Sequence, residues 1–224
     1  MRARHLLAQL SAAATTTLAA TPKPSQPNFR ISPLDGTPIA LPTAPQLAFQ
    51  DRELGLLIHF NIATYLNASL DGCNNVPGLV PSASIFDPTL LDPDQWMDVA
   101  ASVGAKYATL VAKHNCGFAL WPSEVSFASR EGEDVGYNYT VADSPVRGRD
   151  VVGEFVAAAR KKGLGYGFYY SVVVNNFLNV QDSRVNESRW APGQVNVTDR
   201  VYDEVVFEQL GQLWGEYGLL TEVS

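Results

Sequence analysis

A repeating order of strand-like and helix-like segments most constrains what this chain can fold into. Residues 54–60, 106–114 and 164–171 are short apolar runs of strand length. Helix-like segments with one apolar face follow at 92–103, 150–162 and about 199–217, and another strand begins at Leu219. Alternating strands and helices are typical of a parallel sheet, so the sequence predicts an α/β fold.

The helix boundaries carry their own signals. Asp92 and Pro93 open the first helix as an N-cap and a first-turn proline, and Gly104 ends it. Gly163 ends the second helix after two lysines that suit the negative end of the helix dipole.

The connections between these segments are unequal in length. Each helix returns to the next strand through a few residues around a glycine, whereas each strand leaves through a long loop, at about 61–91, 114–149 and 172–199. Such loops usually have about 2–6 residues. Because parallel α/β folds build their active sites from the loops at the carboxyl ends of the strands, the sequence predicts a site at this edge.

Neutral hydrogen-bonding side chains end three successive predicted strands. These are His59, then His114 with Asn115, then Tyr169 with Tyr170, and Trp121 and Phe118 lie nearby in sequence. Parallel neighbours would bring them to one rim, where neutral polar groups beside aromatic rings suit a sugar. The alternative is structural: a histidine at a strand end often only satisfies a backbone group, and a strand tyrosine often lies in the core.

Two other chemistries deserve consideration. His59, His114, Cys73 and Cys116 are possible soft metal ligands, but no closely spaced ligand motif is present, so no metal or other cofactor is expected. The two cysteines either form a disulfide or remain free thiols, and the sequence leaves both open. Carboxylates for glycoside chemistry occur only in predicted loops, at Asp71, Glu124, Asp134, Asp182 and Glu187.

Composition narrows the partners and the location. The 224 residues carry a net charge of −7, which argues against nucleic acid, and no apolar run reaches the roughly 20 residues that span a bilayer. Residues 1–20 are expected to be a signal peptide and 21–45 an irregular proline-rich lead-in. Secretion is also favoured by four N-glycosylation sequons, at Asn67, Asn138, Asn186 and Asn196.

KHNCGFALWPS is similar to the KHHDGFxLWPS stretch of the α-L-fucosidases of glycoside hydrolase family 29. Four segments, in order along the chain, also resemble this family: its first strand in LGLLIHF, its first helix and second strand in DPDQWMDVAASVGAKYATL, its next helix and strand in DVVGEFVAAARKKGLGYGFYYS, and the approach to its fourth strand in LGQLWGEYGLLTEV. The resemblance implies a (β/α)8 TIM-like barrel, of which residues 46–224 would be an incomplete catalytic part with three to four βα units. It also implies a fucosylated glycan as substrate.

The resemblance implies roles for individual residues. His59, His114 and Tyr169 match family positions that hold the sugar hydroxyls, and we expect Asn115 and Trp121 to contact the substrate as well. Asn115 and Cys116 depart from the family's histidine and aspartate. The family's nucleophile and acid/base would lie beyond Ser224, so the 224-residue chain is expected to be inactive alone. The alternative is a secreted, non-catalytic carbohydrate-binding or regulatory product.

Overall fold

A computed structural model describes residues 29–66, 73, 78–187 and 190–224. The chain divides into a first compact unit that ends at Gln46 and a second, Leu47–Ser224. The expected signal peptide lies outside the described residues. Within the described part of the chain, no helix is both long and apolar enough to cross a membrane.

The first unit contains a β-hairpin where the sequence predicts irregular chain. Strands β1 (Phe29–Ile31) and β2 (Pro38–Ala40) pair antiparallel. The turn between them closes through a hydrogen bond from Ser32 N to Thr37 O, and Gly36 adopts the left-handed backbone that the turn needs (φ 73°). The expectation of an irregular lead-in is therefore corrected for residues 29–40.

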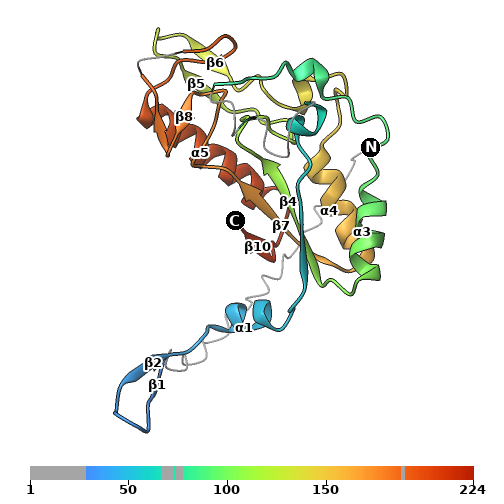
Figure 1. The fold of residues 1–224 in the computed structure, drawn as a ribbon, viewed down its shortest axis with the longest axis vertical. Helices are drawn as coiled ribbons and strands as arrows, with labels where there is room; N and C mark the ends of the chain where they lie inside the picture. The colour runs from blue at the N-terminus through green and yellow to red at the C-terminus, as the bar shows by residue number, and fades with distance from the viewer. Residues whose placement is uncertain (1–28, 67–72, 74–77, 188–189) are drawn as a thin grey trace, which may run out of the picture. The chain divides into compact units, whose positions relative to one another are not determined.

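The second unit is built on a four-stranded parallel sheet in the order β10–β7–β4–β3 (Figure 1). Its strands are β3 (Gly55–Ile58), β4 (Tyr107–Lys113), β7 (Gly165–Tyr170) and β10 (Glu222–Val223). This confirms the predicted parallel α/β architecture. Strands β10 and β3 are the edges of the described sheet, which is open.

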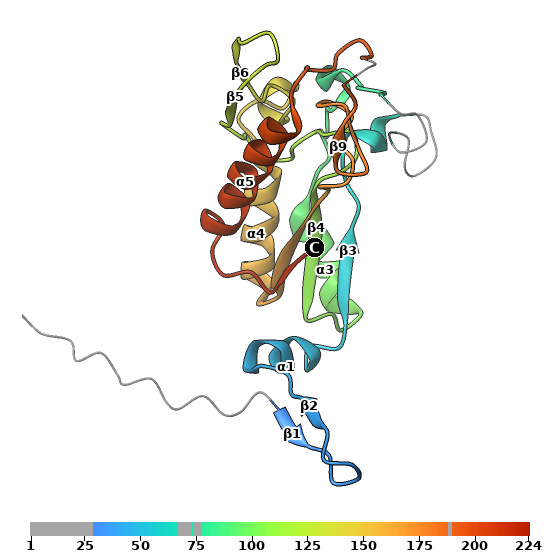
Figure 2. The ribbon, with the colours of Figure 1, turned by 90° about the vertical axis from the view of Figure 1, so that its left-hand side faces the viewer.

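Three helices follow these strands, as predicted: α3 (Pro93–Ser102), α4 (Val151–Lys162) and α5 (Asp199–Gly215). Each begins at a side-chain cap, because Asp92, Asp150 and Thr198 accept from backbone N–H groups of the first turn. Helices α3 and α4 lie side by side (Figure 1), and α4 and α5 lie on the same side of the strands (Figure 2).

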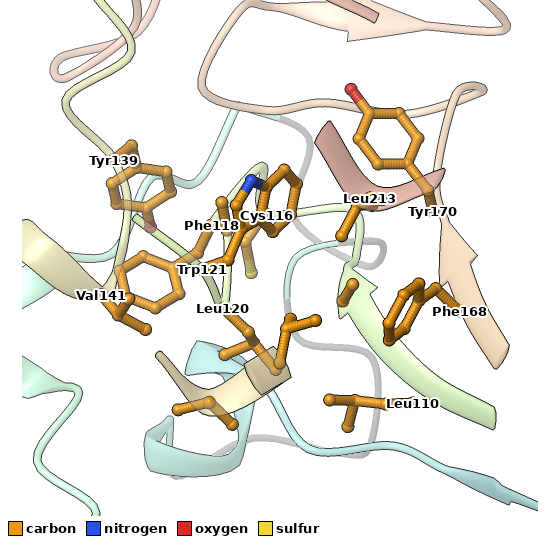
Figure 3. Close-up of a cluster of buried hydrophobic side chains, with 14 of the residues drawn as sticks. Leu110, Cys116, Phe118, Leu120, Trp121, Tyr139, Val141, Phe168, Tyr170 and Leu213 are labelled. Carbon is orange, nitrogen blue, oxygen red and sulfur yellow. The ribbon is translucent and has the colours of Figure 1, made fainter. Parts of the chain in front are cut away.

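The sheet separates two kinds of side chain by strand periodicity. Leu110, Phe168 and Tyr170 point toward the helices and belong to the main hydrophobic core (Figure 3). The alternate positions Leu57, Thr109 and Tyr169 occupy the opposite face, which we call the inner face. Leu57 is 54% exposed there.

The long loops contain short elements of their own. Helix α1 (Ala44–Gln50) precedes the sheet, and the loop after β3 holds the 3-10 turns η1 (Ile62–Tyr65) and η2 (Ala83–Ile85). The loop after β4 holds the hairpin β5–β6 (Ser126–Ala128, Asp134–Gly136) and η3 (Val141–Asp143). The loop after β7 holds the hairpin β8–β9 (Val180–Gln181, Arg184–Val185).

Candidate functional site

A β-bulge in β4 turns His114 onto the inner face. The register between β4 and β7 shifts between Val111 and Lys113, so that Lys113 pairs with Tyr170. Without the extra residue, simple alternation would send Lys113 to the inner face and His114 toward the helices. The bulge reverses this, and His114 emerges beside Tyr169.

Three aromatic side chains meet at the carboxyl ends of β3, β4 and β7. The ring centroids of His59 and His114 are 5.5 Å apart, and those of His114 and Tyr169 are 5.7 Å apart. His59 is exposed, and the other two rings are half-buried. We call His59, His114 and Tyr169 the rim cluster. The geometry meets the sequence prediction for these three side chains. Tyr170, expected at the same rim, is 5% exposed and belongs to the core, because alternation along β7 turns it toward the helices.

Lys113, the residue before His114, links the ends of β4 and β7. Its side chain is fully buried, its Nζ lies 4.0 Å from the centre of the Tyr170 ring, and it donates a 2.9 Å hydrogen bond to the Ser171 carbonyl. Burial lowers the pKa of Lys113 to about 7, because the charged ammonium loses its hydration. Its hydrogen bond to Ser171 and its contact with Tyr170 hold the end of β4 against the end of β7.

Asn115, the residue after His114, is buried, and its expected contact with the substrate stays a prediction. It is 8% exposed, and its Oδ1 accepts a 2.9 Å hydrogen bond from Ser171 Oγ. Its carbonyl accepts from Asn176 N at 2.8 Å. The described contacts of Asn115 are therefore with the loop after β7, which fixes the backbone next to His114.

Sequence reasoning missed the asparagine pair that organises this loop. Asn175 and Asn176 are both fully buried. Asn175 Oδ1 accepts from Leu178 N and its amide donates to Tyr137 Oη, while Asn176 Nδ2 donates to the carbonyls of Cys73 and Leu79. The sequence signal for this pair is its position inside the apolar run VVVNNFLNV. Amides in an apolar run are expected to be buried, and buried amides need hydrogen-bond partners.

The turn after His114 is packed closely against Asn175. Gly117 has φ 89°, a backbone conformation that favours glycine, and a Cβ placed there would collide with Asn175 Oδ1. Tyr137 Oη donates to the Gly117 carbonyl at 2.5 Å. This turn therefore requires the glycine that the sequence supplies.

The two cysteines form a disulfide between Cys73 and Cys116, with Cα atoms 5.1 Å apart. The bond joins the loop after β3 to the turn after β4, two residues from His114. It also removes both thiols from the four soft ligands considered for a metal. The described residues contain no group of three or more His, Cys, Asp or Glu side chains placed to hold a metal ion.

Trp121 lies in the core and not at the rim. It is 1% exposed, and its Nε1 donates a 2.9 Å hydrogen bond to Gln212 Oε1 of α5. Figure 3 shows the indole within the buried cluster of Phe118, Leu120 and Tyr170. A buried indole has no surface left for a ligand, so the expectation that Trp121 contacts the sugar is corrected.

The loop carboxylates singled out in the sequence lie on the surface where they are described. Glu124, Asp134, Asp182 and Glu187 are exposed, Glu187 forms an ion pair with Arg130, and Asp71 lies outside the described residues. On the inner face, Glu222 of β10 accepts hydrogen bonds from Thr109 and Ser224. Glu222 is in register with Gly167, two residues before Tyr169 in β7.

The sequons differ in accessibility. Asn138 and Asn186 are exposed, Asn196 is half-buried with its amide donating to Glu131 at 3.0 Å, and Asn67 lies outside the described residues. Glycan attachment at these positions remains a prediction.

Comparison with known proteins identifies relatives of this arrangement. The family model described as Alpha-L-fucosidase matches residues 80–221. The chain is 33% identical over 135 residues to Alpha-L-fucosidase 1 of Arabidopsis thaliana, covering 59% of this chain and 23% of that protein. It is 40% identical over 88 residues to the tissue alpha-L-fucosidase of Mus musculus, covering 39% and 17%.

A solved structure is similar as well. A glycoside hydrolase 29 family member from an unknown rumen bacterium superposes with a TM-score of 0.54 and 32% identity, over 81% of this chain and 27% of that one. The chain thus spans less than a quarter of the length of the two curated relatives above.

Proposed function

The chain belongs to the alpha-L-fucosidase family, and from this premise we propose that its rim cluster binds the L-fucosyl residue of a fucosylated glycan. The observation that carries the proposal is the convergence of His59, His114 and Tyr169 within 5.7 Å between neighbouring ring centroids. Family membership supports glycoside hydrolase chemistry. The substrate and the barrel to which this sheet would belong are part of the proposal.

The chemistry of the rim cluster suits a neutral sugar. A neutral imidazole offers one donor and one acceptor, and a phenol offers both, so the three rings match hydroxyl groups without needing a charge on the ligand. Hydrogen bonds to sugar hydroxyls that strengthen as an oxocarbenium-like transition state develops would lower the barrier to glycosidic cleavage.

Cleavage itself needs carboxyl groups that the rim does not supply. A retaining glycosidase uses two carboxyl groups about 5–5.5 Å apart. The rim side chains at the ends of β3, β4 and β7 are two imidazoles and one phenol, of His59, His114 and Tyr169, and none of them carries a carboxyl group. We therefore propose that the 224-residue chain alone binds fucose without hydrolysing fucosides, as a carbohydrate-binding product would. We also propose secretion, which the disulfide and the exposed sequons support.

An NMR titration with L-fucose and an aryl fucoside hydrolysis assay, both on the 224-residue chain, test the proposed binding without hydrolysis. L-Fucose should bind in an NMR titration, and His114→Ala should weaken binding about tenfold, as expected when a well-packed contact worth about 1.4 kcal/mol is lost. Lys161→Ala on the exposed face of α4 is the matched control. Absence of fucose binding by the folded chain would refute the fucose site, and release of phenol from an aryl fucoside would refute the proposed lack of hydrolysis.

A further inference from the structure

A pocket lies in the loops that leave the same edge of the sheet as the rim cluster. It has a volume of about 460 Å³, within the usual range for small-molecule sites. We call it the amide pocket, because four amide side chains line it together with an indole and two small residues: Asn179, Gln181, Asn186, Gln194, Trp190, Gly78 and Ala191.

The lining selects for a neutral, hydroxyl-rich ligand. All of its described residues are uncharged, so it offers no opposite charge to a phosphate, a carboxylate or an ammonium group. Each primary amide provides two donors and an acceptor, which suits hydroxyl groups pointing in several directions. Trp190 adds a half-buried aromatic surface, on which the C–H face of a pyranose ring can pack.

The amides are held in place before any ligand arrives. Gln181 Nε2 donates to Asn176 Oδ1 at 3.1 Å, and Gln194 Nε2 donates to the Asn176 carbonyl at 2.7 Å. Gln194 Oε1 accepts from Ala191 N at 2.7 Å. A primary amide can donate two hydrogen bonds and accept two, so the one bond of Gln181 and the two of Gln194 orient these side chains and leave them capacity for a ligand.

A short hydrogen-bond path connects the amide pocket with the rim cluster. Asn176, which fixes Gln181 and Gln194, donates through its backbone N–H to the carbonyl of Asn115, the residue after His114. The two sites therefore share one scaffold residue at one edge of the sheet.

We propose that the amide pocket binds a second, non-fucosyl pyranose unit of the same glycan, packed against Trp190. The assignment of a common glycan rests on the proposed function, whereas binding of a neutral pyranose by the pocket does not. The pocket would then select for longer fucosylated oligosaccharides over simple fucosides.

The test uses the full 224-residue chain, made in a host that attaches no N-glycans, because Asn186 both lines the pocket and begins a sequon. Three probes are titrated by NMR: L-fucose, lactose and 2′-fucosyllactose. We expect lactose to bind and 2′-fucosyllactose to bind about tenfold more tightly than either part, a range typical of one added anchor contact.

Variants separate the two sites. Trp190→Leu keeps an apolar side chain but removes the aromatic surface, and it should weaken lactose and 2′-fucosyllactose about tenfold while leaving L-fucose unchanged. Trp190→Tyr should restore most of the affinity. Trp214→Leu, at a 51% exposed tryptophan of α5, is the matched control and should bind like the unaltered chain.

The outcomes distinguish the two proposals. Binding of lactose that depends on Trp190, without binding of L-fucose, would keep the amide pocket and refute the rim as a fucose site. Binding of L-fucose with no response to lactose, or equal lactose affinity in Trp190→Leu and the unaltered chain, would overturn the amide pocket as a sugar site.

Discussion

Lys113 is a charged residue that the fold places out of reach of water. Its pKa falls to about 7 in the folded chain, whereas an unfolded lysine keeps a pKa of about 10.5. Between these values the unfolded state holds one more proton than the folded state. The free energy of unfolding should therefore rise with pH across this window, by up to ~1.4 kcal/mol per pH unit, and the stabilisation should be fully lost below pH 7.

Lys113→Met should flatten this pH dependence. Urea unfolding at pH 7.5, 8.5 and 9.5 measures the slope, and the range stops below pH 10 because tyrosines such as Tyr170, whose pKa burial raises, act in the opposite direction there. Lys161→Met, at a lysine whose side chain is 64% exposed, should keep the slope. Equal slopes for Lys113→Met and the unaltered chain would contradict the effect of burial.

Trp121 offers a second prediction at the residue scale. Trp121→Phe should lower the free energy of unfolding by about 1–3 kcal/mol, because it shrinks a buried side chain and removes the hydrogen bond to Gln212. Binding of L-fucose by the folded variant should not change, since the indole lies in the core. Loss of sugar binding with unchanged stability would return Trp121 to the binding site.

At the scale of elements, the sequence predicts what local chemistry decides. The first two helices begin and end within about two residues of their expected bounds, because Asp92, Gly104 and Gly163 act as stop and start signals over a few residues. The three main strands, β3, β4 and β7, lie within the predicted apolar runs, because a short apolar run is also a local feature of the sequence.

What the sequence does not predict depends on residues far apart in the chain. The bulge between Val111 and Lys113 exists only through pairing with β7, yet it decides which face His114 occupies. The roles of Asn175 and Asn176 come from partners in other loops. A tryptophan such as Trp121 looks the same in the sequence whether it lies in a core or in a sugar site, and only its contact with α5 decides between them. Local patterns can flag such a residue, as the amide pair in VVVNNFLNV does, but they do not identify its partners.

The Cys73–Cys116 disulfide joins two loops across 43 residues of sequence. Replacing both cysteines by alanine should lower the free energy of unfolding by about 2–4 kcal/mol, because the unfolded chain regains the entropy of an open loop. Fucose affinity should fall too, since Cys116 lies two residues from His114 in the turn that the bond restrains. Denaturant unfolding and NMR titration measure both effects; Ser102→Ala, at an exposed helix position, is a control, and unchanged stability in the double variant would contradict the expected role.

For the whole molecule, the inner face and the edge strands of the sheet expose apolar side chains to solvent. Parallel sheets are normally covered on both faces, yet Leu57 of edge strand β3 is 54% exposed on the inner face and Val223 of edge strand β10 is 53% exposed. We therefore expect the 224-residue chain to self-associate with rising concentration in sedimentation velocity experiments.

Leu57→Lys should shift this association to about tenfold higher concentration, because a lysine at an edge strand must be desolvated when another chain pairs with it. Leu90→Lys, at a loop leucine that is 95% exposed, adds the same charge away from the sheet and should leave association unchanged. If both variants shift it equally, net charge and not the open sheet governs association; if the unaltered chain stays monomeric throughout, its exposed inner face is stable in water.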